Sequence, residues 1–156
     1  MNSRVLARSE SGTSLVEFAL VAPVIIFLLV GLIEIGRFAF FSILAANAAR
    51  AGAQYGAQNL MTAYDSAGIT NAALQDGQNL SNWTATGGGI VVQQLCAVSG
   101  GSPQPCGDPS NLAPPQNTIY YVQVHVTGLF TSLLNYPGIP NSLPISGSAM
   151  MRVATQ

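Results

Sequence analysis

The sequence predicts an α+β protein, in which a long N-terminal transmembrane helix continues into a small domain with a three-stranded antiparallel sheet packed on the helix. Three observations lead to this prediction. Phe18–Ile33 is apolar and carries no charge, and Phe38–Asn59 has no proline and many alanines. Further on, several segments alternate between apolar and polar side chains, which is the period of a half-buried strand. Charged residues make up only 7% of the chain, against about 25% in ordinary soluble domains, so the composition is typical of a membrane-anchored protein.

The first helix is long enough to cross a membrane. Thr13 to Ile33 makes roughly 31 Å of helix at 1.5 Å per residue, which is close to the thickness of a bilayer core. Arg4 and Arg8 precede this segment, and arginines in a short flank favour a cytoplasmic N-terminus. We therefore expect three parts, of which the last lies across the membrane. They are a cytoplasmic leader over residues 1–12, a transmembrane and extended helix over 13–59, and an extracytoplasmic α+β domain over 60–156.

Two other interpretations of the apolar segment stay open. It can be a plain single-pass anchor that undergoes no processing. It can also belong to a signal peptide with a small-residue cleavage site at Ala46–Ala48, which would release a secreted enzyme beginning at Ala49. The apolar region of a signal peptide usually has about 7–15 residues, with the cleavage site just beyond it. Because Ala46–Ala48 lies far downstream, the spacing disfavours the signal-peptide interpretation.

The helix beyond the membrane segment carries small residues at four-residue spacing. One row is Ala45, Ala49, Ala53 and Ala57, and another is Ala48, Gly52 and Gly56. Such rows allow another helix or a sheet to approach closely, although alanines alone would also serve helix propensity. Glycine costs about 1 kcal/mol in a helix, so the interspersed glycines favour the packing interpretation. Glu34 and Arg37 share one face and can pair where the helix leaves the lipid.

The rest of the chain predicts a small sheet covered by the long helix. Asp65–Gly68 has the composition of a turn, and Thr70 can cap a short helix that runs to about Trp83. The predicted strands are Ile90–Val98, Thr118–Thr127 and Ile145–Val153. A three-stranded sheet needs a cover on its apolar face to be stable. We therefore expect the apolar side chains of these strands to face the C-terminal part of the long helix.

The two cysteines flank a predicted flexible turn. Cys96 and Cys106 enclose a segment rich in glycine and serine. A disulfide between them would stabilise the fold by about 2–3 kcal/mol if the compartment is oxidising, which agrees with the predicted topology. The alternative is two free thiols. Structural zinc is disfavoured because it requires four ligands and the only histidine, His125, is far away in the sequence.

The sequence contains no catalytic constellation. His125 is expected to be a solvent-facing strand residue, because no cysteine- or serine-centred motif surrounds it. Asp65, Asp76 and Asp108 are too scattered for a calcium-binding loop. There is also no basic patch with interleaved aromatic residues, so nucleic acid is not expected as a partner. We predict that the chain is not an enzyme and uses neither a cofactor nor a metal ion.

A single carboxylate stands where the apolar segment begins. Placing the Glu17 carboxylate in a bilayer would cost roughly 2.5–3.5 kcal/mol near the centre and less near the surface. We therefore expect a positively charged group to pair with it. Gly12 lies five residues before Glu17. If the chain were cut after Gly12, the new ammonium group at Thr13 would lie one helical turn from Glu17.

These residues carry a resemblance to known families. A short leader with arginines, then Gly12, Glu17, the aromatic Phe18 and an apolar helix resemble the class III signals of type IV pilins and pseudopilins. The string Glu17–Pro23 is more similar still to TadE-like proteins of the tight-adherence (Flp) pilus system. Three further segments resemble that family: Glu34–Arg37, Asn47–Ala53 and the ending Gly147–Arg152. The resemblance implies a pilin-like fold and favours a minor pseudopilin of TadE or TadF type.

The resemblance also implies roles for individual residues. Gly12 would precede the cut made by a prepilin peptidase, Thr13 would become the N-terminus, and Glu17 would assist processing or subunit docking. The implied partners are this peptidase, the Tad pilus subunits, the inner-membrane assembly platform and membrane lipid. The implied location is the inner membrane, with the C-terminal domain periplasmic or extracellular. Phe18 stands where major Flp pilins commonly carry tyrosine, which argues against the major subunit. The competing hypothesis is an unprocessed anchor whose extracytoplasmic domain is a binding module.

Overall fold

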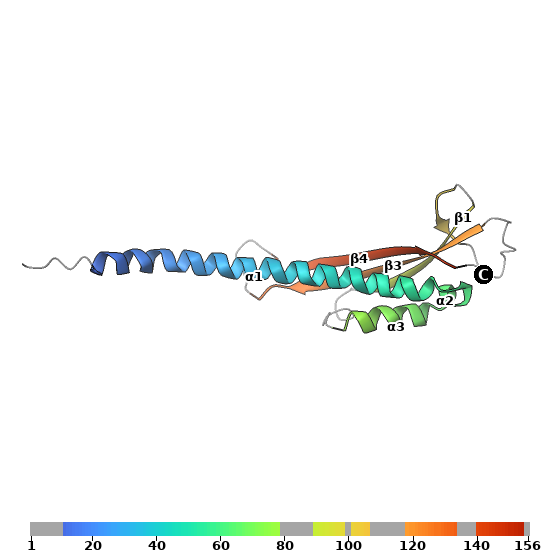
Figure 1. Cartoon of the computed structure of the whole chain (residues 1–156), viewed down its shortest axis with the longest axis horizontal. Coiled ribbons are helices and arrows are strands. Elements are labelled where there is room, and N and C mark those ends of the chain that lie inside the picture. Colours follow the sequence, from blue (N-terminus) through green and yellow to red (C-terminus); the bar gives the residue numbers. More distant parts are fainter. Residues whose placement is uncertain (1–10, 79–88, 99–100, 107–117, 134–139, 155–156) are drawn as a thin grey trace, which may run out of the picture. The chain divides into compact units, whose positions relative to one another are not determined.

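The computed structural model describes residues 11–78, 89–98, 101–106, 118–133 and 140–154. The chain divides into two compact units, Met1–Arg37 and Phe38–Gln156. In chain order the elements are α1 (Ser11–Gly56), α2 (Leu60–Tyr64), α3 (Ser66–Asp76), β1 (Ile90–Val98), β2 (Gln104–Pro105), β3 (Thr118–Thr131) and β4 (Ser142–Arg152), as Figure 1 shows. The predicted combination of a long N-terminal apolar helix with an antiparallel sheet is confirmed.

The described residues of the first unit form the N-terminal part of α1. Its large apolar side chains are exposed from Leu15 onwards, and by length and composition the helix can cross a membrane. Pro23 lies inside the helix without ending it, which membrane helices tolerate more readily than soluble ones. The predicted pairing of Glu34 with Arg37 is confirmed by an ion pair of 2.8 Å between Oε2 and Nη1.

The sheet of the second unit has four strands, so the prediction of three strands is wrong. The strand order is β2-β1-β3-β4, and each neighbouring pair is antiparallel. The missed strand is β2, which has two residues and pairs through Leu95↔Pro105 and Cys96↔Gln104. A strand of two residues is too short to show an alternating pattern, so periodicity could not reveal it.

The other strands match their predicted positions closely. The bounds of β1 are those predicted, while β3 extends to Thr131 and β4 begins at Ser142. The extension continues the same register, with Phe130 opposite Leu143. Pro144 lies within β4, where it is tolerated because β4 is an edge strand.

The core lies between the sheet and the C-terminal part of α1. It brings alternate residues of β3, namely Val122, Val124 and Val126, together with Ala45, Ala48, Ala49 and Ala53 of α1. A Cβ atom added to Gly52 would meet the Ala73 Cβ at 3.2 Å, and one added to Gly56 would meet Val122 Cγ1 at 3.0 Å. The small residues therefore allow both α3 and the sheet to approach α1 (Figure 1). This confirms the packing interpretation of the alanine and glycine rows.

Neither N-cap of the two short helices was predicted from the sequence. The prediction that Thr70 caps the helix is wrong, because Thr70 lies inside α3 and Asp65 is the N-cap. The Asp65 carboxylate accepts hydrogen bonds from the Gly68 backbone N–H and the Tyr55 hydroxyl, each 2.9 Å long. These bonds hold the pKa of Asp65 below its usual value of 3.8, the bond from Gly68 having the larger effect. The helix ends at Asp76, and Trp83, where we predicted its end, lies outside the described residues.

Candidate processing and docking site

The residues of the predicted processing motif lie together at the start of α1. The helix begins at Ser11, so Gly12 and Thr13 are in its first turn and Glu17 follows one turn later. Thr13 and Glu17 are four residues apart, so they share one face of the helix and are separated by about 6 Å along its axis. All three side-chain positions are exposed. A Cβ atom added to Gly12 would meet nothing within 4 Å, so the motif is accessible from outside the helix.

Cutting the chain between Gly12 and Thr13 would change the electrostatics of this face. Hydrolysis converts the Thr13 amide nitrogen into an ammonium group and makes Thr13 the first residue of the helix. Two unit charges about 6 Å apart attract by roughly 3 kcal/mol at an effective dielectric constant of 20. That attraction is large enough to offset the cost of the carboxylate, which is roughly 2.5–3.5 kcal/mol at the centre of a bilayer and less near its surface. The positive end of the helix dipole would also favour Glu17 in the first turns.

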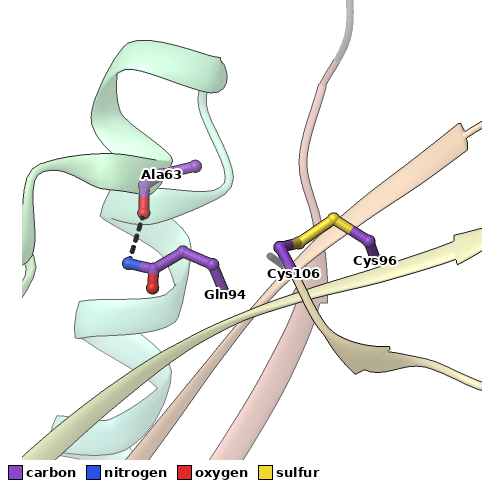
Figure 2. The surroundings of a disulfide bond; sticks show 4 residues. All are labelled: Ala63, Gln94, Cys96 and Cys106. Carbon is purple, nitrogen blue, oxygen red and sulfur yellow. Dashed lines mark hydrogen bonds between the residues drawn. A yellow bond between two sulfur atoms is a disulfide. The ribbon is translucent and has the colours of Figure 1, made fainter. Parts of the chain in front are cut away.

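The second predicted feature, the cysteine pair, lies at one edge of the sheet. Cys96 on β1 and Cys106 just after β2 are joined by a disulfide, with 5.1 Å between their Cα atoms (Figure 2). The backbone N–H of Cys106 donates a hydrogen bond of 3.0 Å to the carbonyl oxygen of Gln94. The disulfide and this bond close the same short loop. The loop is therefore held to β1 by both a covalent and a polar contact.

Gln94 also joins this edge of the sheet to α2. Its Nε2 atom donates a hydrogen bond of 3.1 Å to the carbonyl oxygen of Ala63, and Figure 2 shows the side chain reaching across to that helix. We did not identify Gln94 from the sequence. Gln94 shares one side of β1 with Ile90 and Val92, which pack against the core, so its position in the alternation is the signal that could have identified it. A polar side chain at such a position usually has a partner.

Breaking the disulfide should weaken the fold of the second unit. We expect the double variant Cys96→Ser/Cys106→Ser to lose about 2–3 kcal/mol of unfolding free energy, because a short covalent loop no longer restricts the unfolded chain. Thermal unfolding of the full chain in detergent, followed by circular dichroism, would measure this loss. A reducing agent should lower the midpoint of the wild type to that of the variant and leave the variant unchanged. Equal midpoints without reductant would show that the disulfide adds no stability.

Among the described residues, the remaining polar candidates do not form a further site. His125 is exposed on β3, where its neighbours across the sheet are Val91 and Ser148. Within the part of the chain that the structure describes, no group of three His, Cys, Asp or Glu side chains could hold a metal ion. Asp108 lies outside the described residues.

A comparison with known protein families agrees with the resemblance carried by the Gly12–Glu17 motif. Residues 12–54 match the family of TadE-like proteins. The matched segment begins at Gly12, includes Glu17 and covers nearly all of α1, so the resemblance inferred from the sequence is confirmed. No curated protein and no solved structure matches the chain. Together, the family match and the helix that can cross a membrane support a membrane-anchored protein related to Tad pili.

Proposed function

We propose that this protein is a minor pseudopilin of TadE or TadF type, which is processed after Gly12 and acts in the assembly of Tad (Flp) pili. The observation that carries the proposal is the Gly12–Glu17 motif at the start of α1, inside the segment that matches the TadE-like family. The proposal assigns the protein a structural role in adhesion-related pili and no catalytic role.

The proposed topology places the leader in the cytoplasm and the second unit across the inner membrane. Arg4 and Arg8 favour this orientation. The disulfide between Cys96 and Cys106 is consistent with it, because disulfides persist in oxidising compartments outside the cytoplasm. The prepilin peptidase would then meet the Gly12–Thr13 bond at the cytoplasmic face. The Tad pilus subunits and the inner-membrane platform are the proposed partners after cleavage.

The proposed role of Glu17 is electrostatic. In the processed protein its carboxylate would pair with the Thr13 ammonium group of the same chain or of a neighbouring subunit. The pair would remove most of the cost of an unpartnered charge in a low-dielectric environment. Pairing with the Thr13 ammonium group of a neighbouring subunit would also fix the position of one subunit along the next. This role requires processing, because the intact chain has an uncharged amide at Thr13.

Blocking the cut at Gly12 tests the proposal. We expect Gly12→Ala to accumulate at full length in cells that contain prepilin peptidase, while the mature wild type begins at Thr13. Mass spectrometry and N-terminal sequencing would measure both termini. The matched control is Gly31→Ala in the same helix, because an added Cβ at either glycine meets nothing within 4 Å. The control should be processed normally.

Other termini would contradict the proposal in distinguishable ways. An intact leader beginning at Met1 in the wild type would favour the unprocessed anchor with a binding module. A mature terminus at Ala49 would instead favour release by signal peptidase.

A further inference from the structure

The exposed side of α1 remains apolar well beyond the predicted end of the membrane segment at Ile33. Phe40 is 57% exposed and Ile43 is 62% exposed. The next exposed positions along this side of the helix are polar, namely Asn47, Arg50 and Gln54. The exposed surface of α1 therefore changes from apolar to polar between Ile43 and Asn47. An exposed aliphatic and aromatic surface of this kind usually marks a contact with lipid or with another protein.

The end of the β3–β4 hairpin packs against the same stretch of helix. The Phe130 ring lies 5.5 Å from the ring of Phe38 and 5.9 Å from that of Phe41, measured between centroids. Beyond Phe130, the Ser132 backbone N–H donates a hydrogen bond of 2.9 Å to the carbonyl oxygen of Asn141. This bond keeps the two strands together past the end of the ladder.

The hairpin end also exposes apolar side chains. Leu133 is 69% exposed, and Leu143, which lies opposite Phe130, is 36% exposed. No charged residue occurs in the sequence between His125 and Arg152. We call the exposed hairpin residues Leu133 and Leu143, together with Phe38 of α1, the hairpin-end surface. All of them belong to the second unit.

The length of the apolar helix surface indicates what covers this region. From Phe18, which follows Glu17, to Ile43 the helix measures roughly 38 Å, because each residue adds 1.5 Å. A bilayer is about 30 Å thick in its hydrocarbon core and about 40–45 Å thick with its headgroup layers. The apolar surface of α1 therefore exceeds the core by roughly 8 Å and ends within the headgroup layer. The stretch Phe38–Ile43 then corresponds to the headgroup layer.

We propose that the hairpin-end surface lies in the headgroup layer of the membrane that α1 crosses, and that Leu133 and Leu143 make a second, peripheral contact with lipid. Phenylalanine and leucine are side chains that interfacial segments insert at this depth. The Glu34–Arg37 pair is compatible with such a position, because the two charges neutralise each other. The proposal rests on the membrane anchoring in the proposed function and adds a lipid-binding role for the hairpin.

Spin labels on single cysteines test this proposal in the full chain. The variants Leu133→Cys and Leu143→Cys would carry the label in phosphatidylcholine–phosphatidylglycerol vesicles, without reductant so that Cys96 and Cys106 stay joined. Two reference sites bracket the result. Leu28→Cys reports the membrane segment, and Met150→Cys reports a residue that is 51% exposed on the same strand as Leu143. The measured quantity is the accessibility of the label to oxygen relative to that to a water-soluble nickel chelate.

We expect the oxygen-to-nickel ratio at Leu133 and Leu143 to shift from the value at Met150 towards the value at Leu28. A ratio equal to that of Met150, with Leu28 still in lipid, would overturn the lipid contact and leave the anchor intact. If Leu28 itself were accessible only to nickel, the anchoring on which the proposed function depends would fail as well. Dipolar broadening at Leu133 that disappears on dilution with unlabelled protein would show that a second copy covers the surface, and would also overturn the proposal.

Discussion

Replacing Gly147 with alanine is expected to destabilise the second unit by about 3 kcal/mol, because overpacking a well-packed core typically costs about 1–3 kcal/mol and more when the obstacle cannot move. A Cβ atom at this position of β4 would overlap the carbonyl carbon of Ala45, and it would lie 2.5 Å from both the Ala45 oxygen and the Ala46 nitrogen. These atoms belong to the backbone of α1, which cannot change rotamer to make room. The strand would have to move away from the helix, and the core between them would open.

Gly128→Ala is a matched control for this effect. Gly128 is also buried, lies on the neighbouring strand β3, and would place its new Cβ at 3.6 Å from Ile145 Cγ1, which is an ordinary contact. We expect this variant to change the unfolding free energy by less than about 1 kcal/mol. Urea or thermal unfolding of both full-length variants in the same detergent would measure the difference. Equal losses in the two variants would show that close approach to the helix is not the reason for glycine at 147.

The contrast between Gly147 and the strands around it shows what the sequence could predict. Alternation located most of β3 and β4, whereas β1 was located by its run of apolar and β-branched residues. The sequence pattern could not show which residue Gly147 contacts. A glycine in a strand can mark a bulge, a bend or a close approach, and only the three-dimensional arrangement shows that Ala45 lies opposite.

The short helices were predicted less well because several caps compete locally. Thr70 and Asp65 are both acceptable N-caps by residue type. The carboxylate of Asp65 also accepts a hydrogen bond from Tyr55, which lies ten residues earlier on α1. Such a contact is set by tertiary packing. Asn59 and Thr62 form a reciprocal capping box for α2, although Thr62 is not the glutamate or glutamine usual at that position.

The candidate site was predicted from the sequence alone, and the structure adds accessibility. Gly12, Thr13 and Glu17 could be identified from their spacing and from the apolar segment that follows them. The structure shows that Gly12 is open to its surroundings and that Thr13 and Glu17 lie within consecutive turns of one helix. The partner that completes the proposed charge pair does not exist before the Gly12–Thr13 bond is cut. No property of the uncut chain could therefore reveal whether Glu17 pairs within one subunit or between two.

Removing the charge of Glu17 is expected to abolish most pilus assembly while leaving the protein in the membrane. Losing an attraction of roughly 3 kcal/mol corresponds to a roughly hundredfold weaker contact. Insertion should not suffer, because a neutral side chain lowers the cost of placing α1 in lipid. The variants Glu17→Ala and Glu17→Gln would be made in a host that carries the Tad machinery. Surface pili would be sheared and quantified by immunoblot, alongside the amount and the N-terminus of the protein in the membrane fraction.

The two variants separate charge from shape. Glutamine keeps the size and the hydrogen-bonding oxygen of Glu17 but cannot attract an ammonium group, so the electrostatic role predicts that both variants fail equally. Ser14→Ala is a control close by in the sequence, because it changes an exposed residue of the same first turns without altering charge. Normal piliation of Glu17→Gln would show that the carboxylate is not needed for docking. If the variants instead remained uncleaved, Glu17 would act in processing, and the loss of pili would follow from the absence of a free Thr13 ammonium group.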